Sequence, residues 1–466
     1  MIQLPRPAFS PGQAMGAALM AGYVLMLALN LPGHLSYDSI VQLYEGRFGA
    51  QVTWAPAFYS WILGAFDSVS PGVSLYLAFS AFLATGALMG LRGLRPRVSW
   101  ASAILAALLV FTPTLLVYQG VVWKDVFFAN LALAGFVCLA HAARLWERPR
   151  RPWLFLIGAL LAFAAAAQAR QNGIIVTVFA AAALAWMARG RGWRSALAWG
   201  LGGFVAVLAA TALLGLLTQP RGEAPDTRGD RGLRIILHYD IVGAAAAKPG
   251  LPLNEVRAAN PAAEQAVRVL AESLYSPERV DFIGQDKVLG PLLWRLPDEV
   301  IVAQWRQIVT RHPDAYLEHR WKVFTWVFAT PAIDSCLPVF VGVAGSPEMA
   351  AALGIQEGME PPDRALYNYV TWFLDTPLYS HVFYALIAGV CLVLLVRRRE
   401  GADMVVAALL ASALAFAGSF AAISLACDYR YLYFLDLAAL AGLLYVVMDP
   451  PLGRPKRWTR PRWRRP

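Results

Sequence analysis

The sequence is poor in charge. Asp, Glu, Lys and Arg make up only 15% of its 466 residues, whereas 58% are hydrophobic and the mean hydropathy is +0.51. A soluble domain carries about 25% charged residues. Because the shortage extends over most of the chain, it excludes a soluble globular domain and predicts a polytopic membrane protein.

Other features that would point to known chemistry are absent as well. The six histidines form no spaced cluster, so no metal site is predicted, although an assisting divalent metal remains compatible with the sequence. No GxGxxG, Walker, zinc or serine-nucleophile motif stands in a suitable context, and no cofactor is predicted. No repeat of about 20 to 50 residues is visible. No small-residue cleavage site follows the first apolar run, which we interpret as a retained helix.

Ten apolar runs approach or reach the length of about 20 residues that spans a bilayer. They predict an all-α protein with about ten transmembrane helices. The runs cover residues 13–31, 72–91, 101–118, 126–143, 153–169, 173–188, 196–217, 379–396, 403–425 and 432–448.

The basic residues predict how these helices are oriented. Arginine clusters follow the runs that end at residues 91, 143, 188 and 396, and the chain ends in a strongly basic tail. Positive loops remain on the cytoplasmic side, so both termini are expected there. The net charge of +10 is thus explained by topology. The tail suits an anchor on anionic lipid better than an arm for nucleic acid, and no nucleic-acid partner is expected.

This topology divides the chain into four parts. Residues 1–217 form an N-terminal transmembrane module with a first outer loop at 32–71, in which residues 56–66 are too short to span and suit an interfacial helix. Residues 218–378 form an extracytoplasmic lid, which opens with a loop over 219–232. Within the lid, Pro297 and Pro313 each begin a helix. Residues 379–448 supply the last three transmembrane helices, and residues 449–466 form the basic tail.

The stretch "SYDSIVQLYEGR" raises the first question about function. If Ser36 or Asp38 caps a short helix, Asp38, Gln42 and Glu45 follow at positions i, i+4 and i+7 and share one face. The alternative is an N-capping carboxylate on a solvated helix face. An ionisable residue beside the membrane is a functional candidate because its burial is costly.

Two further places combine charge with the outer ends of helices. In "VVWKDVFF", Asp125 also suits the first turn of a helix, but Lys124 is a cation on the side that otherwise lacks short-loop cations. In "QARQNG", Asn172 and Gly173 suit a turn between two helices. Arg170 has no such structural explanation, and we favour a functional role for it.

The fourth place is "ACDYRYLYFLD", before the last apolar run. Its tyrosines suit an interfacial aromatic belt, and Asp428 and Arg430 can pair with each other. Arg430 is nevertheless a third isolated cation on the outer side. One rim is therefore expected to combine carboxylates with cations, which suits an acid–base group beside an anion site.

In this order, the motifs resemble those of the C-type (GT-C) membrane glycosyltransferases, which include the protein O-mannosyltransferases and the aminoarabinose transferases of lipid A. The chain departs from the pattern at Trp54-Ala55-Pro56, where such relatives have W-H-P, so the imidazole is missing. The motifs that carry the resemblance are Tyr37-Asp38-Ser39, Trp123-Lys124-Asp125, Arg170-Gln171-Asn172-Gly173 and Tyr429-Arg430-Tyr431.

The resemblance implies a GT-C-like fold and an inverting transfer of a sugar from a polyprenyl-phosphate donor to a glycan, lipid or protein acceptor of the cell envelope, such as lipopolysaccharide. It would make Asp38 the general base, on the periplasmic side. Lys124, Arg170 and Arg430 would hold the lipid phosphate. The other implied substrate-binding residues are Gln42, Glu45, Asp125, Asn172 and Tyr431.

Two alternatives and one covalent feature remain open. A transporter or flippase for a lipid-linked substrate would use intramembrane charges too, but internal repeats are expected there. A glycan ligase or polymerase would share the cations and differ in using a diphospholipid donor. Cys336 and Cys427 are both expected on the oxidising side, which gives the hypothesis of a disulfide between them. Cys138 and Cys391 lie in apolar runs and are interpreted as small core residues.

Overall fold

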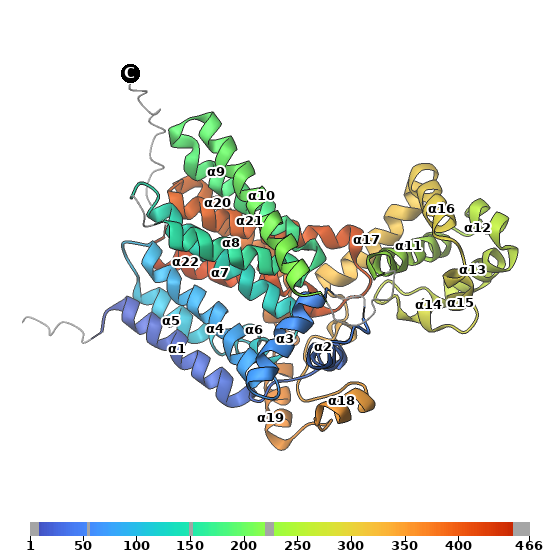
Figure 1. Ribbon diagram of the computed structural model, residues 1–466, viewed down its shortest axis with the longest axis horizontal. Coiled ribbons are helices and arrows are strands. Elements are labelled where there is room, and N and C mark those ends of the chain that lie inside the picture. Colours follow the sequence, from blue (N-terminus) through green and yellow to red (C-terminus); the bar gives the residue numbers. More distant parts are fainter. Residues whose placement is uncertain (1–8, 54–55, 149–151, 220–227, 451–466) are drawn as a thin grey trace, which may run out of the picture.

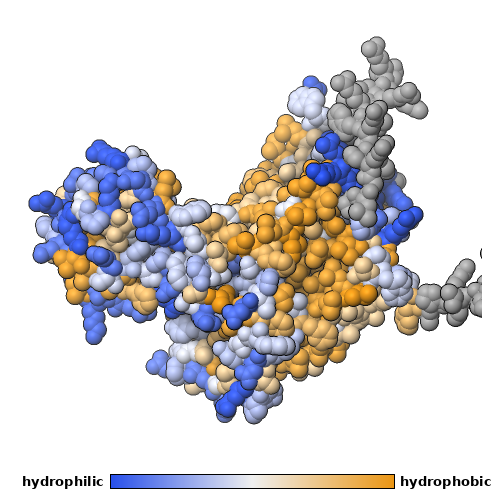
Figure 2. All heavy atoms as spheres, turned by 180° about the vertical axis from the view of Figure 1, so that it is seen from behind, coloured by the Kyte–Doolittle hydropathy of each residue, from blue (hydrophilic) through white to orange (hydrophobic). Residues whose placement is uncertain are grey.

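The computed structural model describes residues 9–53, 56–148, 152–219 and 228–450, and every regular element in these ranges is helical. A bundle of long helices occupies one side of the molecule and a smaller group of short helices the other (Figure 1). Figure 2 shows apolar surface concentrated over the bundle and polar surface over the smaller group. The predicted all-α polytopic architecture is confirmed.

All ten apolar runs form helices. Eight helices in the described ranges are long and apolar enough to cross a membrane, a bent pair makes a ninth, and α8 (Trp153–Ala169) is apolar but only 17 residues long. Three of the eight reach that length only together with an adjoining 3-10 turn: α4 (Ser74–Gly90) within the span Ser74–Leu94, α9 (Ile174–Ala188) within Gln171–Arg191, and α22 (Tyr433–Met448) within Tyr429–Met448. The other five are α1 (Pro11–Asn30), α7 (Lys124–Arg144), α10 (Trp193–Leu217), α20 (His381–Arg398) and α21 (Gly401–Ile423).

The third run is not one straight helix, so this part of the prediction is wrong. It breaks into α5 (Trp100–Leu109) and a second piece that begins with α6 (Pro113–Leu116), and the two pieces are bent by 68°. Proline has no backbone N–H and disfavours a helical residue before it. Thr112 is accordingly extended, and Pro113 opens the new helix.

The centre of the bundle is formed by α7 and α22. Over an 18-residue window of these two spans, 78% and 83% of the residues are buried, against 11% in α10, which lies at the edge. The ring of Phe128 on α7 stacks on Phe416 of α21 at 4.8 Å and meets Phe434 of α22 edge-on at 5.3 Å. The start of α7 is therefore held rigidly from several sides.

Two helices of the first outer loop lie outside the spans, α2 (Tyr37–Phe48) and α3 (Ala57–Val69). The predicted short helix over 56–66 is confirmed and runs on to Val69. The helices cross in backbone contact, because a Cβ atom on Gly46 would lie 2.1 Å from the carbonyl oxygen of Ser60. Arg47 closes the pair by donating from Nε to Asp67 at 2.7 Å.

Residues 228–329, here called the outer lobe, form a helical unit with its own apolar core. The helices expected after Pro297 and Pro313 are both confirmed, as α16 and α17. The lobe comprises α11 (Arg228–Ala247), α12 (Asn254–Ala259), α13 (Pro261–Leu274), α14 (Asp281–Gln285), α15 (Leu289–Trp294), α16 (Asp298–Arg311) and α17 (Pro313–Ala329).

The loop predicted over 219–232 is wrong at its end, because α11 already begins at Arg228. Turn-forming residues there are overruled by packing of this helix against α13, α16 and α17. Residues 220–227 lie outside the described part of the chain. So do Trp54, Ala55 and the basic tail from residue 451 onward.

Beyond the lobe, the chain returns to the bundle. It forms α18 (Pro347–Leu353), which packs on α2, and α19 (Pro361–Thr371), which contacts α1. The segment before α18 pairs with the start of α2, since Leu35 N–H donates to Gly342 at 2.9 Å and Ala344 N–H to Leu35 at 2.9 Å. The first turn of α2 is thereby fixed.

Candidate functional site

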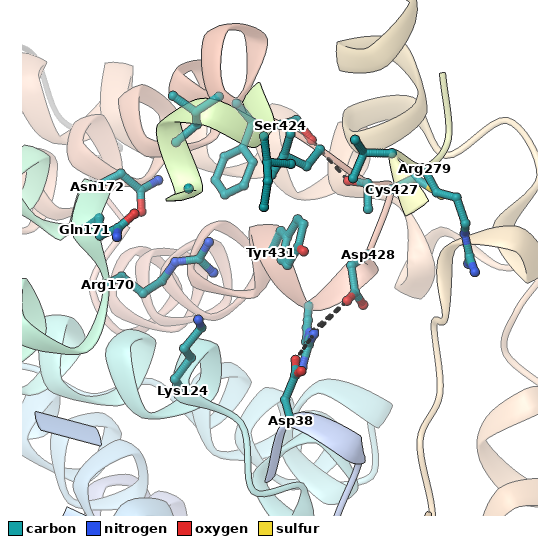
Figure 3. Close-up of a pocket in the computed structure, with 18 of the residues that line it drawn as sticks. Asp38, Lys124, Arg170, Gln171, Asn172, Arg279, Ser424, Cys427, Asp428 and Tyr431 are labelled. Atoms are coloured by element: carbon teal, nitrogen blue, oxygen red, sulfur yellow. Dashed lines mark hydrogen bonds and ion pairs between the residues drawn. The ribbon is translucent and has the colours of Figure 1, made fainter. Parts of the chain in front are cut away.

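A cavity of about 810 Å³ opens where the outer lobe meets the bundle, and most of the predicted site residues lie on its wall (Figure 3). Charged side chains line one part. An apolar wall faces them, formed by Leu233 and Ile236 of α11 with Phe420 and Ile423 of α21. Predicted residues that line the cavity are Asp38, Gln42, Lys124, Arg170, Asn172, Arg430 and Tyr431.

Hydrogen bonds join the first two motifs. The Ser39 hydroxyl donates to the carbonyl of Val122 at 2.7 Å, and the Trp123 indole donates to Ser36 Oγ at 2.9 Å. The start of α2 is therefore fastened to the residues that lead into α7. This fastening brings Asp38 and Lys124 to the same cavity, although they are far apart in the sequence.

Arg430 is the centre of the charged part. Its Nη2 donates to Asp38 Oδ2 at 2.6 Å, its Nε donates to Asp428 Oδ2 at 2.9 Å, and the same Nε lies 3.8 Å from Asp125 Oδ2. The guanidinium also lies over the Trp123 ring, 4.9 Å from its centroid. One cation thus connects three carboxylates from three segments.

Arg170 supplies a second guanidinium from another side. It follows α8 in an extended conformation and pairs with Asp125, whose side chain is almost fully buried. The rings of Phe416, Phe420 and Tyr431 surround it at 5.4 to 5.6 Å. Aromatic faces stabilise a desolvated cation, so Arg170 can stay charged at the cavity wall.

Figure 3 shows how the charges are distributed. Lys124 and Arg170 extend into the cavity from one side, while Asp38 and Asp428 lie on the other, with Arg430 between these two carboxylates. Asn172 stands further along the wall and donates to Ser419 Oγ at 3.3 Å. The arrangement offers cations and a carboxylate to the same space.

The ionisation of Asp38 follows from its neighbours. Burial by itself raises the pKa of the Asp38 carboxyl, but the charge and hydrogen bond of Arg430, with the charge of Lys124, hold the pKa below its ordinary value. Asp38 is therefore a carboxylate at neutral pH, and its side chain is still 47% exposed. It can accept a proton from a group inside the cavity.

Two predicted residues do not line the cavity. Asp125 lies behind the wall, where Arg170 and Arg430 approach it. Glu45 is buried and accepts four hydrogen bonds, from the backbone N–H groups of Val52 and Thr53, the Thr53 hydroxyl and the Ser60 hydroxyl. In this structure, Glu45 connects α2 to the loop before α3 and to α3 itself.

The hypothesis of a disulfide is confirmed. Cys336 and Cys427 are bonded across 91 positions of the chain, with their Cα atoms 4.9 Å apart. The segment just before Asp428 is also held by the outer lobe, because Val280 N–H donates to Leu425 at 2.9 Å and Arg320 donates to Ser424 at 2.8 Å. The outer lobe therefore holds in place the segment that leads into Asp428 and Arg430.

The residues that the outer lobe contributes to the cavity were not predicted. Arg279 and Asp281 line it although they come from a polar outer segment without any distinguishing pattern. Among the described residues, no group of three or more His, Cys, Asp and Glu side chains is placed to hold a metal ion. Arginine engages the carboxylates of Asp38, Asp125 and Asp428 instead.

Comparison with known proteins gives limited similarity. No family model and no curated protein matches the sequence. Among solved structures, the chain is similar to the archaeal oligosaccharyltransferase AglB from Archaeoglobus fulgidus, in complex with an inhibitory peptide and a dolichol-phosphate. The match covers 93% of this chain and 50% of that one, with 13% identity and a TM-score of 0.39. This chain thus spans half the length of AglB, and any functional argument rests on its own residues.

Proposed function

We propose that this protein is an inverting glycosyltransferase, which moves a sugar from a polyprenyl-phosphate donor to an acceptor in the cell envelope. One observation carries the proposal: the Asp38 carboxylate shares a cavity of about 810 Å³ with Lys124, Arg170 and Arg430. Acid–base chemistry and anion binding are thus available side by side. The motif resemblance to GT-C enzymes implies the class of donor.

The cations suit the donor's phosphate. In glycosyl transfer from a lipid phosphate, negative charge develops on the phosphate oxygens as the sugar leaves, and preorganised cations stabilise that charge. Lys124 and Arg170 enter the cavity from one side (Figure 3), and Arg430 lines it where it binds Asp38 and Asp428. The apolar residues of α11 and α21 opposite them offer a surface for the first units of the prenyl chain.

Asp38 is proposed as the general base. Its carboxylate removes the proton of the acceptor hydroxyl while that oxygen attacks the anomeric carbon. The bond from the anomeric carbon to the phosphate oxygen breaks on the opposite face, so the configuration inverts and polyprenyl phosphate leaves. Gln42, Asn172 and Tyr431 line the same cavity and are proposed to contact the sugar or the acceptor.

The proposed location is the periplasmic face of a bacterial inner membrane. The Cys336–Cys427 disulfide lies at the edge of the cavity, and such bonds persist in oxidising compartments. Described arginines lie at the other end of the bundle, in the last turns of α7 and α20 and directly after α9, as expected for the cytoplasmic side.

Two experiments test the reaction class. Lipid and glycan mass spectrometry compares a strain that lacks the gene with strains that carry the wild-type protein or Asp38→Asn. The acceptor is the lipid or glycan that lacks one sugar in both the deletion and the Asp38→Asn strain and carries that sugar again when the wild-type protein is present. Purified protein should then release polyprenyl monophosphate. Release of a diphosphate would favour the ligase, and movement of an unaltered lipid without product would favour the flippase.

A further inference from the structure

Two further cavities lie toward the end of α7 and α8 that is opposite to the proposed catalytic cavity. Whereas α7 begins and α8 ends at the proposed catalytic cavity, a pocket of about 250 Å³ lies where α7 ends and α8 begins. Trp146, Trp153 and Trp199 line it together with Arg148 and Arg191. This end of the bundle carries the arginine-rich loops.

An apolar groove of about 290 Å³ lies next to the pocket, between α8, α9 and α10. Trp153, Leu156 and Trp199 line both, so the two cavities adjoin along these three side chains. The groove reaches Phe163, ten positions along α8 from Trp153, which corresponds to about 15 Å of helix. That depth is half of a hydrocarbon core of about 30 Å, the length available to one acyl chain in one leaflet.

The groove is open because small residues line α10. Gly202 and Gly203 lie on its wall. A Cβ atom on Gly203 would meet Leu184 at 2.5 Å, whereas a Cβ atom on Gly202 would meet no atom within 4 Å. Gly203 therefore allows α10 to pack closely on Leu184 of α9, whereas the position of a side chain at residue 202 is empty.

The pocket has the groups that hold a phosphate at a membrane interface. The Arg191 guanidinium lies 5.1 Å from the centroid of the Trp146 ring, which meets the Trp199 ring edge-on at 4.9 Å. Trp146 is more than nine-tenths buried, and its indole N–H finds no acceptor among the described residues. Glu147 also lines the pocket, so the described lining residues carry two arginines and one glutamate, a sum of +1.

We propose that this site binds one anionic glycerophospholipid from the leaflet at the basic end of the bundle. Arg148 and Arg191 hold the phosphate, and one acyl chain occupies the adjoining groove. The site is separate from the proposed catalytic cavity, and the proposal does not depend on the reaction.

Native mass spectrometry of the purified full-length protein tests the headgroup contact, with phosphatidylglycerol and phosphatidylcholine of identical acyl chains as probes. We expect phosphatidylglycerol to bind more tightly, and Arg191→Ala to weaken it about tenfold, the effect of one lost charge-assisted hydrogen bond. Arg194 is the matched control, because it lies over Trp193 at 5.4 Å but does not line the pocket. Equal binding of the two lipids, or equal losses in Arg191→Ala and Arg194→Ala, would overturn the proposal.

Two further variants test the rest of the site. Gly202→Leu should fill the groove and weaken phosphatidylglycerol binding, whereas Gly389→Leu, at an equally open position on α20, should not. Glu147→Gln should tighten binding because it removes a negative charge beside the phosphate. If Gly202→Leu behaves like Gly389→Leu, or if Glu147→Gln weakens binding, the lipid does not occupy this site.

Discussion

The substitution Asp38→Asn separates the proposed chemistry from donor binding. Asparagine keeps the shape of the side chain and removes its basicity, and the loss of a general base lowers kcat by about 10²- to 10⁴-fold. Arg430 also donates to Asp428 at 2.9 Å, a hydrogen bond that the substitution does not remove. The phosphate site should therefore remain intact while the chemical step slows.

Asp38→Asn should also change the KM for the lipid donor in only one direction, if at all. Asp38 occupies Arg430 Nη2 at 2.6 Å and so competes with a phosphate for the same guanidinium. In Asp38→Asn, the KM for the lipid donor should be unchanged or lower. Initial transfer rates of the purified protein, measured over a range of donor concentrations, give both constants.

A matched control is available in the same cavity. Asp281 lines it from the outer lobe, and Asp281→Asn should leave kcat close to the wild-type value. The base assignment is refuted if Asp38→Asn turns over normally. A raised donor KM with an unchanged kcat would instead make Asp38 a residue that positions Arg430.

Three other predictions concern the surroundings of the site. Arg170→Ala should raise the KM for the lipid donor by at least about tenfold, since a charge-assisted contact is lost, and change the acceptor KM little; equal increases would argue against a phosphate role. Glu45→Ala should lower the unfolding temperature, because the N–H groups of Val52 and Thr53 lose their acceptor, at a cost of about 1–3 kcal/mol for a donor left unsatisfied. A stable variant with impaired transfer would instead favour a substrate role for Glu45. Alkylation of the denatured protein should label two thiols before reduction and four after it, because Cys336 and Cys427 are bonded; four labelled thiols before reduction would contradict the disulfide.

The sequence predicted the features that depend on local signals. Long apolar runs predict spans because the bilayer imposes a length and requires every backbone group to be satisfied within the helix. Pro297 and Pro313 predict helix starts because proline suits the first turn. Pro113 carried a similar signal inside residues 101–118, and it is where the predicted span breaks.

Features that depend on tertiary contact were predicted less completely. Asp38 and Glu45 share a helix face, but seven residues separate them by about 10 Å along the axis. That distance takes Glu45 away from the cavity and into the loop before α3. The contributions of Arg279 and Asp281 depend on how the outer lobe docks on the bundle, which no local pattern encodes.

In the proposed mechanism, the position of Arg430 connects donor binding to the basicity of Asp38. In the free protein, Arg430 and Lys124 hold the pKa of the Asp38 carboxyl below its ordinary value in spite of burial. A donor phosphate that takes over Arg430 removes the main cause of that lowering, so the pKa of Asp38 should rise in the complex. A base with a higher pKa accepts the acceptor's proton more readily, and the site becomes reactive once the donor is bound.

This coupling has a measurable consequence in the pH dependence of transfer. The carboxylate form is the active one, so activity falls as the pH drops through the pKa of Asp38, and a raised pKa moves this loss to higher pH. The profile of kcat/KM reports the free enzyme and that of kcat the complex. We therefore expect the acidic limb of kcat to lie at higher pH than the acidic limb of kcat/KM for the donor. Coincident limbs would mean that the phosphate does not displace Asp38 from Arg430, and the two groups would then act independently.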